Sequence, residues 1–290
     1  GGSMKTRTIT TILWMLVLVL FAACGGNGDG EATGDGEAMD TGYEDGVYFA
    51  QAGEFSESSG WKDVVTIEVE GGEIVMVAWN AAHEQNGRPK DVRSRQGDYG
   101  MVENSDAMAP WYEQAEATEE WLLENQDIGA LSLNDDGRAD AISGATINLA
   151  GFKSVAERAL ERGPVGYGMY EDGVWSAEAE EFSDSGWKDV VSITVISGYI
   201  TAVEWDSFND EGEFKAELSQ AGEYGMVENS DATTSWYDQA TAAESWLIEN
   251  QDPTELSLND EGRADAVSGA TINLSGFKSL AVQALEGHTR

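Results

Sequence analysis

The sequence predicts an α+β fold built from two tandem copies of one small domain. Three observations support this prediction: a long internal repeat, alternating apolar residues early in each copy, and helical spacing of apolar residues later in each copy. The first copy spans residues 43–163 and the second spans 167–287, with the join near 162–166. Because strands precede helices, we expect a small antiparallel sheet with packed helices rather than a wound parallel sheet.

The repeat is carried by segments that recur about 125 residues later along the chain. This period is much longer than that of solenoid units, so it indicates a duplicated domain of about 120 residues, which is large enough to bury its own core. The recurring segments are 43–47 with 170–174, 60–65 with 186–191, and 99–106 with 224–231.

Each copy is predicted to begin with a β-hairpin, because two alternating segments flank a short turn of small residues. These are 64–70 and 74–79 around Gly71 and Gly72, and 190–196 and 200–205 around Ser197 and Gly198.

Helices are predicted later in each copy from apolar residues at helical spacing. One helix covers 236–250 and another closes the second copy. The apolar positions are Trp236, Ala240, Ala243 and Leu247 in the former, and Leu274, Phe277, Ala281 and Leu285 in the latter.

The charge balance limits the possible partners. The chain has 290 residues with 16 Lys and Arg against 54 Asp and Glu, a formal net charge of −38. Nucleic acid is therefore excluded as a partner, because its phosphates would be repelled. The excess of acid is typical of a solvated surface suited to salty or extracellular conditions. A cofactor that carries phosphate would need local cations or a covalent bond.

The N-terminus is typical of an exported lipoprotein. Residues 1–3 resemble an expression scar, and residues 4–24 form a predicted signal peptide with a basic start and a short apolar run at 12–23. The run is short for a membrane-spanning helix, which needs about 20 residues. The residues before Cys24 resemble a lipobox, although phenylalanine stands at position 21 where leucine is usual.

Cys24 is therefore the predicted lipidation site, and the alternative is a free thiol in an uncleaved anchor. It is the chain's only cysteine, so neither an intrachain disulfide nor a Cys-ligated metal site is expected. Residues 25–42 are rich in glycine and acid and should form a flexible tether. We expect the protein at the extracytoplasmic face of the bacterial membrane, held there by its lipid.

The most informative motif occurs once in each copy. Asp-Ala-Ile-Ser-Gly-Ala-Thr at 140–146 returns as Asp-Ala-Val-Ser-Gly-Ala-Thr at 265–271, and both run into Ile-Asn-Leu-x-Gly-Phe-Lys-Ser. The surrounding stretches 132–154 and 257–279 differ at three positions, whereas the copies have drifted far more elsewhere. Whatever restrains these stretches acts on both copies.

The residue types of the motif suit an anion held beside a hydroxyl group. In the first copy, Gly144 permits a turn, Ala145 leaves space open, and Thr146 is expected at the N-terminus of the last helix, where amide groups and the helix dipole favour phosphate. Lys153 follows two helical turns later and is expected to offset phosphate charge. The equivalents in the second copy are Gly269, Ala270, Thr271 and Lys278.

This motif, closing a domain that opens with Asp-Gly-Val-Tyr or Asp-Gly-Val-Trp and a hairpin, resembles the FMN-binding domain family. That family includes subunits of sodium-pumping and Rnf-type redox complexes. It also includes flavinylated lipoproteins of bacterial extracellular electron transfer, whose layout is the most similar. The resemblance covers nearly all of 43–287, and neither copy departs from the pattern.

The resemblance implies that FMN is joined to each motif threonine, Thr146 and Thr271, by a phosphoester bond. In the family a dedicated flavin transferase makes this bond from FAD with magnesium. Two covalent FMN groups are thus expected. The residues implied in recognition by the transferase are Asp140, Ser143 and Gly144 in the first copy, and Asp265, Ser268 and Gly269 in the second.

These residues also admit other interpretations. The threonines could merely be helix N-caps, a common role. Aromatic and methionine residues could pack on the flavin ring or could simply form core. His83 and His288 do not recur between the copies, and neither a catalytic residue nor a metal site is predicted. The aromatic and methionine candidates are Tyr99, Met101, Trp111, Tyr112, Tyr224, Met226, Trp236 and Tyr237.

The expected function is that of a membrane-anchored electron carrier and not of an enzyme. Electrons would come from a membrane quinol or a dehydrogenase and leave to an extracellular acceptor. The acidic surface is expected to lower the flavin potential modestly, because salt screens exposed charge. Two alternatives remain: a flavin-dependent reductase of one specific substrate, and a non-redox lipoprotein that binds or scaffolds a partner.

Overall fold

The structure, a computed structural model, describes residues 42–105, 107–229 and 232–290. The predicted signal peptide, the lipidation site Cys24 and the tether up to residue 41 lie outside these ranges. Within them, no helix combines the length and the apolar character needed to cross a membrane.

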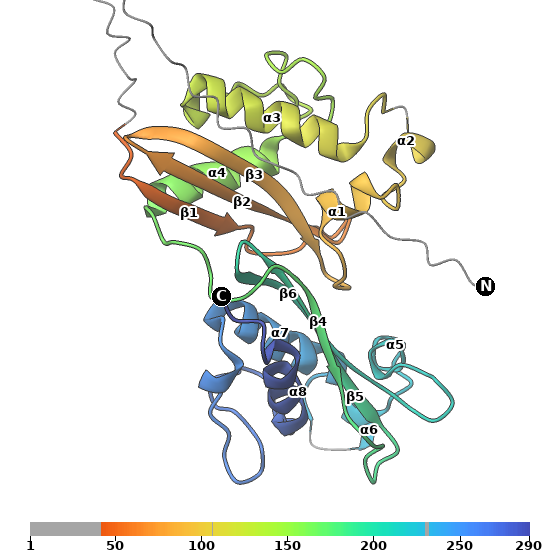
Figure 1. Cartoon of the computed structure of the whole chain (residues 1–290). Coiled ribbons are helices and arrows are strands. Elements are labelled where there is room, and N and C mark those ends of the chain that lie inside the picture. The colour runs from red at the N-terminus through yellow and green to blue at the C-terminus, as the bar shows by residue number, and fades with distance from the viewer. Residues whose placement is uncertain (1–41, 106, 230–231) are drawn as a thin grey trace, which may run out of the picture. The chain divides into compact units, whose positions relative to one another are not determined.

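Two three-stranded antiparallel sheets form the framework, and helices pack against each (Figure 1). The α+β prediction is confirmed in this form, which is consistent with two tandem small domains. The order in each sheet follows the sequence. The strands are β1 (Gly46–Gln51), β2 (Trp61–Glu70) and β3 (Glu73–His83) in the first sheet, and β4 (Gly173–Glu178), β5 (Lys188–Ile196) and β6 (Tyr199–Phe208) in the second.

The two predicted hairpins are present, β2–β3 and β5–β6, with strands longer than the alternating segments indicated. Both turn residues of each hairpin have positive φ: 62° and 78° at Gly71 and Gly72, and 53° and 81° at Ser197 and Gly198. This is the conformation of a type I′ turn, which suits the right-handed twist of the paired strands. The strands β1 and β4 were not predicted from the sequence pattern.

Two long helices accompany each sheet. In the first repeat α3 (Trp111–Asn125) packs on β3, and α4 (Ala150–Arg162) packs on β1 and β2. In the second repeat α7 (Trp236–Asn250) and α8 (Ser275–Leu285) make the same contacts with their own sheet. The bounds of α7 agree with the prediction, and α8 confirms that a helix closes the second copy. The shorter elements are α1 (Lys90–Arg95), α2 (Met101–Asn104), η1 (Ile128–Ala130), α5 (Lys215–Gln220), α6 (Met226–Asn229) and η2 (Pro253–Glu255).

Side chains from α3 and from its C-cap residue form hydrogen bonds with backbone groups of β3, the edge strand of the first sheet. The Gln126 side chain accepts from Ile74 N at 2.7 Å and donates to Ile74 O at 2.9 Å, while Glu119 accepts from Trp79 N at 2.7 Å. An edge strand left open would invite pairing with another chain, so these contacts also protect the sheet. In the second repeat, Gln251 and Glu244 make the same bonds to Ile200 and Trp205.

Each repeat has its own hydrophobic core. In the first, Trp79 lies between Trp111 and Phe152, at ring distances of 5.2 and 5.1 Å. In the second, Trp205, Trp236 and Phe277 repeat this arrangement at 5.3 and 5.2 Å. The sheet and its two long helices thus fix the loop that precedes the last helix of each repeat.

Candidate functional site

The motif threonines lie in a loop before the last helix of each repeat, not at its N-terminus. α4 begins at Ala150 with Leu149 as N-cap, and α8 begins at Ser275 with Leu274 as N-cap; neither has a side-chain cap. Thr146 and Thr271 therefore precede the first helical residue by four positions. The expectation that they start the helix is wrong, and so is the alternative that they cap it.

A buried glutamine holds each threonine in place. The Oε1 atom of Gln114 on α3 accepts from Thr146 N at 2.7 Å, from Ile147 N at 3.2 Å and from Thr146 Oγ1 at 3.1 Å. Its Nε2 atom donates to Ala109 O at 2.9 Å, so the amide is oriented from both ends. In the second repeat Gln239 repeats the three bonds to Thr271 and Ile272 at 2.6, 3.1 and 3.2 Å.

This arrangement changes the chemistry expected of the loop. The backbone amides predicted to meet a phosphate already donate to Gln114, which is 1% exposed. The residues Thr146 and Thr271 are nevertheless exposed. What the loop presents to the outside is therefore a hydroxyl group on a rigid support, and not an anion-binding nest of free amides.

The motif glycines are needed for backbone conformation. Gly144 has a φ of 92° and Gly269 a φ of 84°, and a Cβ atom at either would meet nothing within 4 Å. The constraint is thus the left-handed backbone, which glycine adopts without steric cost. Ala145 is buried in the core rather than leaving open space beside the threonine, and Ala270 is half-buried. The residues exposed around the turns are Asp140, Ser143, Asp265 and Ser268.

An asparagine that the sequence reasoning overlooked stiffens the loop from its other end. The Asn148 side chain donates to Asp136 O at 2.9 Å and accepts from Ala150 N, the first helical amide, at 2.9 Å. A Cβ atom on Gly137 would lie 2.3 Å from that side chain, so glycine is required there. Asn273 and Gly262 repeat the arrangement.

Lys153 and Lys278 do not lie toward the threonines. The Lys153 Nζ atom donates to Leu131 O at 2.7 Å and pairs with Glu157 at 3.7 Å. Lys278 Nζ donates to Leu256 O at 2.7 Å and Thr254 O at 3.2 Å. Their predicted role opposite a phosphate stays a prediction, and it would require these contacts to be exchanged.

A second feature, also missed from the sequence, is a lysine enclosed by three aromatic rings in each repeat. Lys90 Nζ lies 5.3, 5.0 and 5.0 Å from the ring centres of Trp61, Tyr99 and Trp111. Lys215 Nζ lies 4.7, 5.5 and 5.1 Å from Trp187, Tyr224 and Trp236. We call each set a lysine–aromatic cluster. Four of the aromatic residues, Tyr99, Trp111, Tyr224 and Trp236, are among the candidates for packing on a flavin ring, but the two lysines, which are spaced as the two threonines are, were not predicted.

Lys215 is buried and Lys90 is half-buried, and each lies beside carboxylates. Burial lowers the pKa of Lys90 to about 8, and the nearby Asp63 opposes this shift. Burial likewise lowers the pKa of Lys215, with Asp189 and Asp206 opposing. A buried ammonium is costly unless its charge is compensated, and here aromatic faces and carboxylates supply the compensation.

The cluster is joined to the threonine loop through the start of the last helix. A Cβ atom on Gly151 of α4 would lie 1.9 Å from the Asp63 carboxylate, and one on Gly276 of α8 would lie 2.5 Å from Asp189. The aspartates thus lie against the first turn of each helix, where the helix dipole favours negative charge. This packing explains why both copies keep glycine in Gly-Phe-Lys-Ser.

The two repeats differ in one buried hydrogen bond at this aspartate. In the first, Asp63 accepts from Trp79 Nε1 at 2.9 Å. In the second, Asp189 accepts instead from the Ser207 hydroxyl, and Trp205 Nε1 is buried without a partner among the described residues. The first repeat has Ala81 at the position of Ser207 and so offers no competing hydroxyl.

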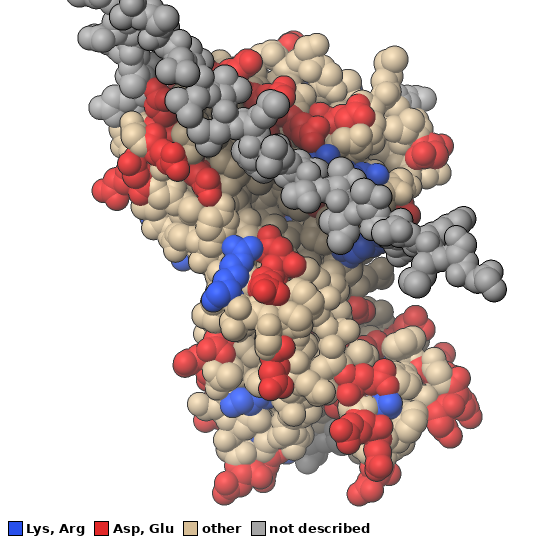
Figure 2. Space-filling model, viewed as in Figure 1, with Lys and Arg blue, Asp and Glu red and all other residues tan. Residues whose placement is uncertain are grey.

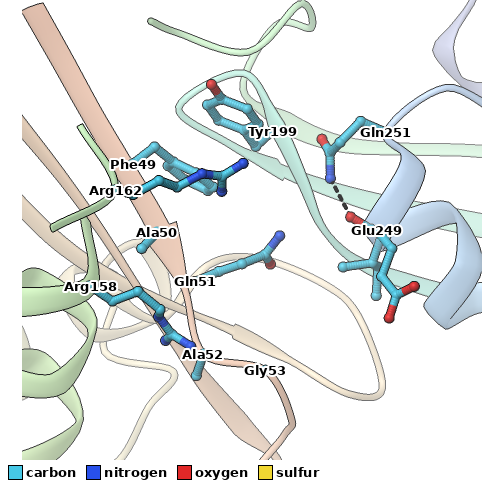
Figure 3. A pocket seen from close by; sticks show the side chains of 11 residues that line it. Phe49, Ala50, Gln51, Ala52, Gly53, Arg158, Arg162, Tyr199, Glu249 and Gln251 are labelled. Atoms are coloured by element: carbon cyan, nitrogen blue, oxygen red, sulfur yellow. Dashed lines mark hydrogen bonds between the residues drawn. The ribbon is translucent and has the colours of Figure 1, made fainter. Parts of the chain in front are cut away.

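A separate pocket of about 340 Å³ contains none of the predicted site residues (Figure 3). Its lining includes Gln51 of β1, Arg158 and Arg162 of α4, and Tyr199 and Gln251. Its lining thus contains two arginines, whereas Asp and Glu are more abundant than Lys and Arg on the face of the molecule seen in Figure 2.

Comparisons with known proteins indicate only in part what kind of protein this is. No protein-family model matches the chain. The chain is similar to a 15 kDa lipoprotein of Treponema pallidum, with 25% identity over 128 residues, or 44% of this chain and 83% of that protein. The aligned length is close to one repeat. This match favours a lipoprotein, as the sequence around Cys24 predicts.

Two solved structures from Clostridium are also similar in sequence. A Clostridium thermocellum protein solved by NMR is 50% identical, covering 41% of this chain and 91% of its own, with a TM-score of 0.34. A Clostridium perfringens protein solved by crystallography is 26% identical, covering 41% and 89%, with a TM-score of 0.34.

Proposed function

We propose that this protein is a lipid-anchored electron carrier with two FMN groups, one joined covalently to Thr146 and one to Thr271. The observation that carries the proposal is the paired presentation of the threonines. Each is exposed, each has its amide and hydroxyl held by a buried glutamine, and neither caps a helix. A threonine with a purely structural role has no need of such an exposed and rigid setting in both repeats.

The residues present fit a covalently attached FMN better than a dissociable one. The amides of each motif threonine and of the residue after it are engaged by Gln114 or Gln239, and the motif lysines donate to backbone carbonyls, so binding a phosphate with them would require these contacts to be exchanged. On a chain with a net charge of −38, a covalent bond would retain the group where these residues do not. FMN, when bound, supplies reversible redox chemistry, while the protein supplies orientation, electrostatics and retention.

The maturation, the electron partners and the location of the protein are proposed from its resemblance to the FMN-binding domain family. We propose that a flavin transferase reads the exposed residues Asp140, Ser143, Asp265 and Ser268 around the two turns. Electrons would enter from a membrane quinol or dehydrogenase and leave to an extracellular acceptor, with the protein tethered through Cys24 to the extracytoplasmic face of the membrane.

Intact-mass measurement after co-expression with a flavin transferase tests the proposal. We expect two FMN additions on the unaltered chain, one in Thr146→Val, one in Thr271→Val and none in the double variant. Thr233→Val is the matched control, because this exposed threonine lies outside the motif, and it should keep both additions. An unmodified mass, in cells where the transferase modifies a known substrate, would refute the proposal.

A second measurement separates a carrier from a reductase. The reduced, flavin-bearing protein should be reoxidised rapidly by several chemically unrelated acceptors if it is a carrier. Sustained turnover of one compound, with slow reaction toward the others, would assign it to the reductases instead.

A further inference from the structure

The two lysine–aromatic clusters share one geometry but differ in charge. In both, the Trp and Tyr rings that face the lysine meet edge to face: Trp61 and Tyr99 at 5.8 Å and 79°, Trp187 and Tyr224 at 5.7 Å and 80°. The framework is thus the same in the two repeats. The charged residues placed around it are not the same, and this difference has a consequence for any group held nearby.

The first cluster has a second cation that the second cluster lacks. Arg93 on α1 places its guanidinium carbon 5.4 Å from the centre of the Trp61 ring, and its charge helps to lower the pKa of His83. At the equivalent position, three residues after the lysine, α5 has Leu218. The first repeat therefore carries Lys90 and Arg93 where the second carries Lys215 alone.

The second cluster has an additional carboxylate. Asp206 on β6 accepts from Ala216 N at 3.0 Å and Ser207 N at 2.7 Å. In the first repeat Asn80 makes the equivalent bonds to Asp91 N at 3.2 Å and Ala81 N at 2.8 Å, so a neutral amide occupies the same place.

Asp91 of the first repeat partly restores the missing charge. Its carboxylate accepts from Asn80 Nδ2 at 2.6 Å and helps to raise the pKa of Glu119. The nearby charge that acts on Lys90 is Asp63, whereas both Asp189 and Asp206 act on Lys215. When Asp91 is included, the formal charges of Lys90, Arg93, Asp63 and Asp91 sum to 0. The charges of Lys215, Asp189 and Asp206 sum to −1.

Each cluster is connected to its threonine by a chain of contacts. Trp111, which covers Lys90, precedes Gln114 by three residues on α3, so their Cβ atoms are about 5–6 Å apart on one helix face. Gln114 in turn bonds the Thr146 hydroxyl directly. Trp236, Gln239 and Thr271 repeat this chain of contacts. A charge difference at the cluster is therefore linked to the threonine hydroxyl through Trp111 and Gln114 in the first repeat, and the second repeat has the equivalent link.

We infer that the two flavin sites are electrochemically unequal, with the higher reduction potential at Thr146 and the lower at Thr271. The inference rests on the proposed function. Reduced flavin carries more negative charge than oxidised flavin at neutral pH, so the more positive cluster stabilises it and the more negative cluster does not. When the protein holds one electron pair, the pair therefore resides mainly on the flavin of the first repeat. Electron transfer between the repeats oxidises one flavin and reduces the other, so it consumes no further reagent.

Single-flavin proteins measure the two sites separately. Thr271→Val retains the first site and Thr146→Val retains the second, and spectroelectrochemical titration gives the midpoint of each. We expect the first site to favour the reduced form at least tenfold over the second, which corresponds to about 30 mV for a two-electron couple. Equal midpoints, or a higher value in Thr146→Val, would overturn the inference.

Exchange substitutions assign the difference to the clusters. Arg93→Leu in the Thr271→Val protein and Asp206→Asn in the Thr146→Val protein each introduce the residue that the other repeat already has, so the fold should tolerate both. The first should lower its midpoint and the second should raise its midpoint.

Matched controls change the same charge on exposed side chains that do not belong to the clusters. Arg88→Leu removes an exposed arginine that pairs with Asp98, and Asp210→Asn removes an exposed carboxylate. Both should leave the midpoints nearly unchanged. Equal shifts in test and control variants would mean that only net charge matters, which also overturns the inference.

These outcomes are separable from a failure of the proposed function. If the mass spectrum shows no FMN, the proposed function fails and the inference fails with it. If FMN is attached at both threonines and the midpoints coincide, the inference alone fails.

Discussion

At the scale of single residues, the ionisation of Glu119 and Glu244 should make the free energy of unfolding depend on pH. Both lie beside the backbone of an inner tryptophan, Trp79 or Trp205, and accept its N–H. Burial raises the pKa of Glu119 to about 7 and that of Glu244 to about 8, in spite of the hydrogen bond, which lowers both. The folded protein therefore binds these two protons more tightly than the unfolded chain does.

The sign of the pH effect follows from that difference. The unfolded carboxyls lose their protons near pH 4.5, while the folded ones keep theirs until about pH 7 and 8. Their contribution to the free energy of unfolding is present below pH 4.5 and is lost as the pH rises to 8. The double variant Glu119→Gln/Glu244→Gln should match the unaltered protein at pH 5 and exceed it at pH 8, in urea unfolding.

Glu120→Gln serves as a control for this prediction, since Glu120 is exposed on the same helix. It should not alter the pH dependence. A double variant that is less stable than the parent at pH 8 would contradict the assignment, because it would show that the ionised carboxylates stabilise the fold.

At the scale of secondary structure, the bond between the end of α3 and the edge of β3 depends on a strained residue. Gln126 is the C-cap of α3 and has a φ of 59°, a conformation that costs a non-glycine residue about 1–2 kcal/mol. It keeps this conformation because its side chain bonds both the N–H and the carbonyl of Ile74. Hydrogen bonding and backbone strain therefore oppose each other at one residue.

Two substitutions separate these contributions. Gln126→Ala loses the two hydrogen bonds to Ile74 and a third to Leu123 O, at 2.6 Å, and keeps the strain, so we expect a loss of about 2 kcal/mol in the free energy of unfolding. Gln126→Gly loses the same bonds but relieves the strain, so its loss should be smaller by about 1 kcal/mol. Urea unfolding followed by tryptophan fluorescence measures both. A glycine variant less stable than the alanine variant would contradict this account.

The same scale shows what the sequence could predict. The hairpins and the helix α7 follow from apolar spacing, because each buries one face on the core beside it. The start of α4 was misplaced, because Asn148 rather than Thr146 bonds the first helical amide. The bonds from Gln114 to Thr146 and the cluster around Lys90 join segments distant in the chain. No local pattern encodes such contacts, and only the repeat spacing hinted at the lysine pair.

At the scale of the whole molecule, the excess of negative charge should weaken the fold in dilute buffer. A net charge of −38 is spread over the surface, as the visible face in Figure 2 illustrates. Repulsion among these charges is relieved on unfolding and is screened by salt, whose Debye length falls from about 10 Å at 0.1 M to about 3 Å at 1 M.

Sodium chloride should therefore stabilise the protein. We expect the thermal midpoint, measured by circular dichroism, to rise by several degrees between low salt and 1 M. The rise should be smaller at pH 4.5, where many carboxylates are protonated. A midpoint that falls or stays constant with salt at pH 7 would show that the acidic groups are compensated locally.

The glutamine bonds to the motif threonines have a consequence for the order of events in biogenesis. Gln114 and Thr146 are 32 positions apart, as are Gln239 and Thr271, so each hydroxyl acquires its setting only after α3 or α7 has docked. An enzyme that reads this setting would ignore a nascent or misfolded chain. Attachment of FMN would then show that a repeat has folded. The number of attached FMN groups would equal the number of folded repeats.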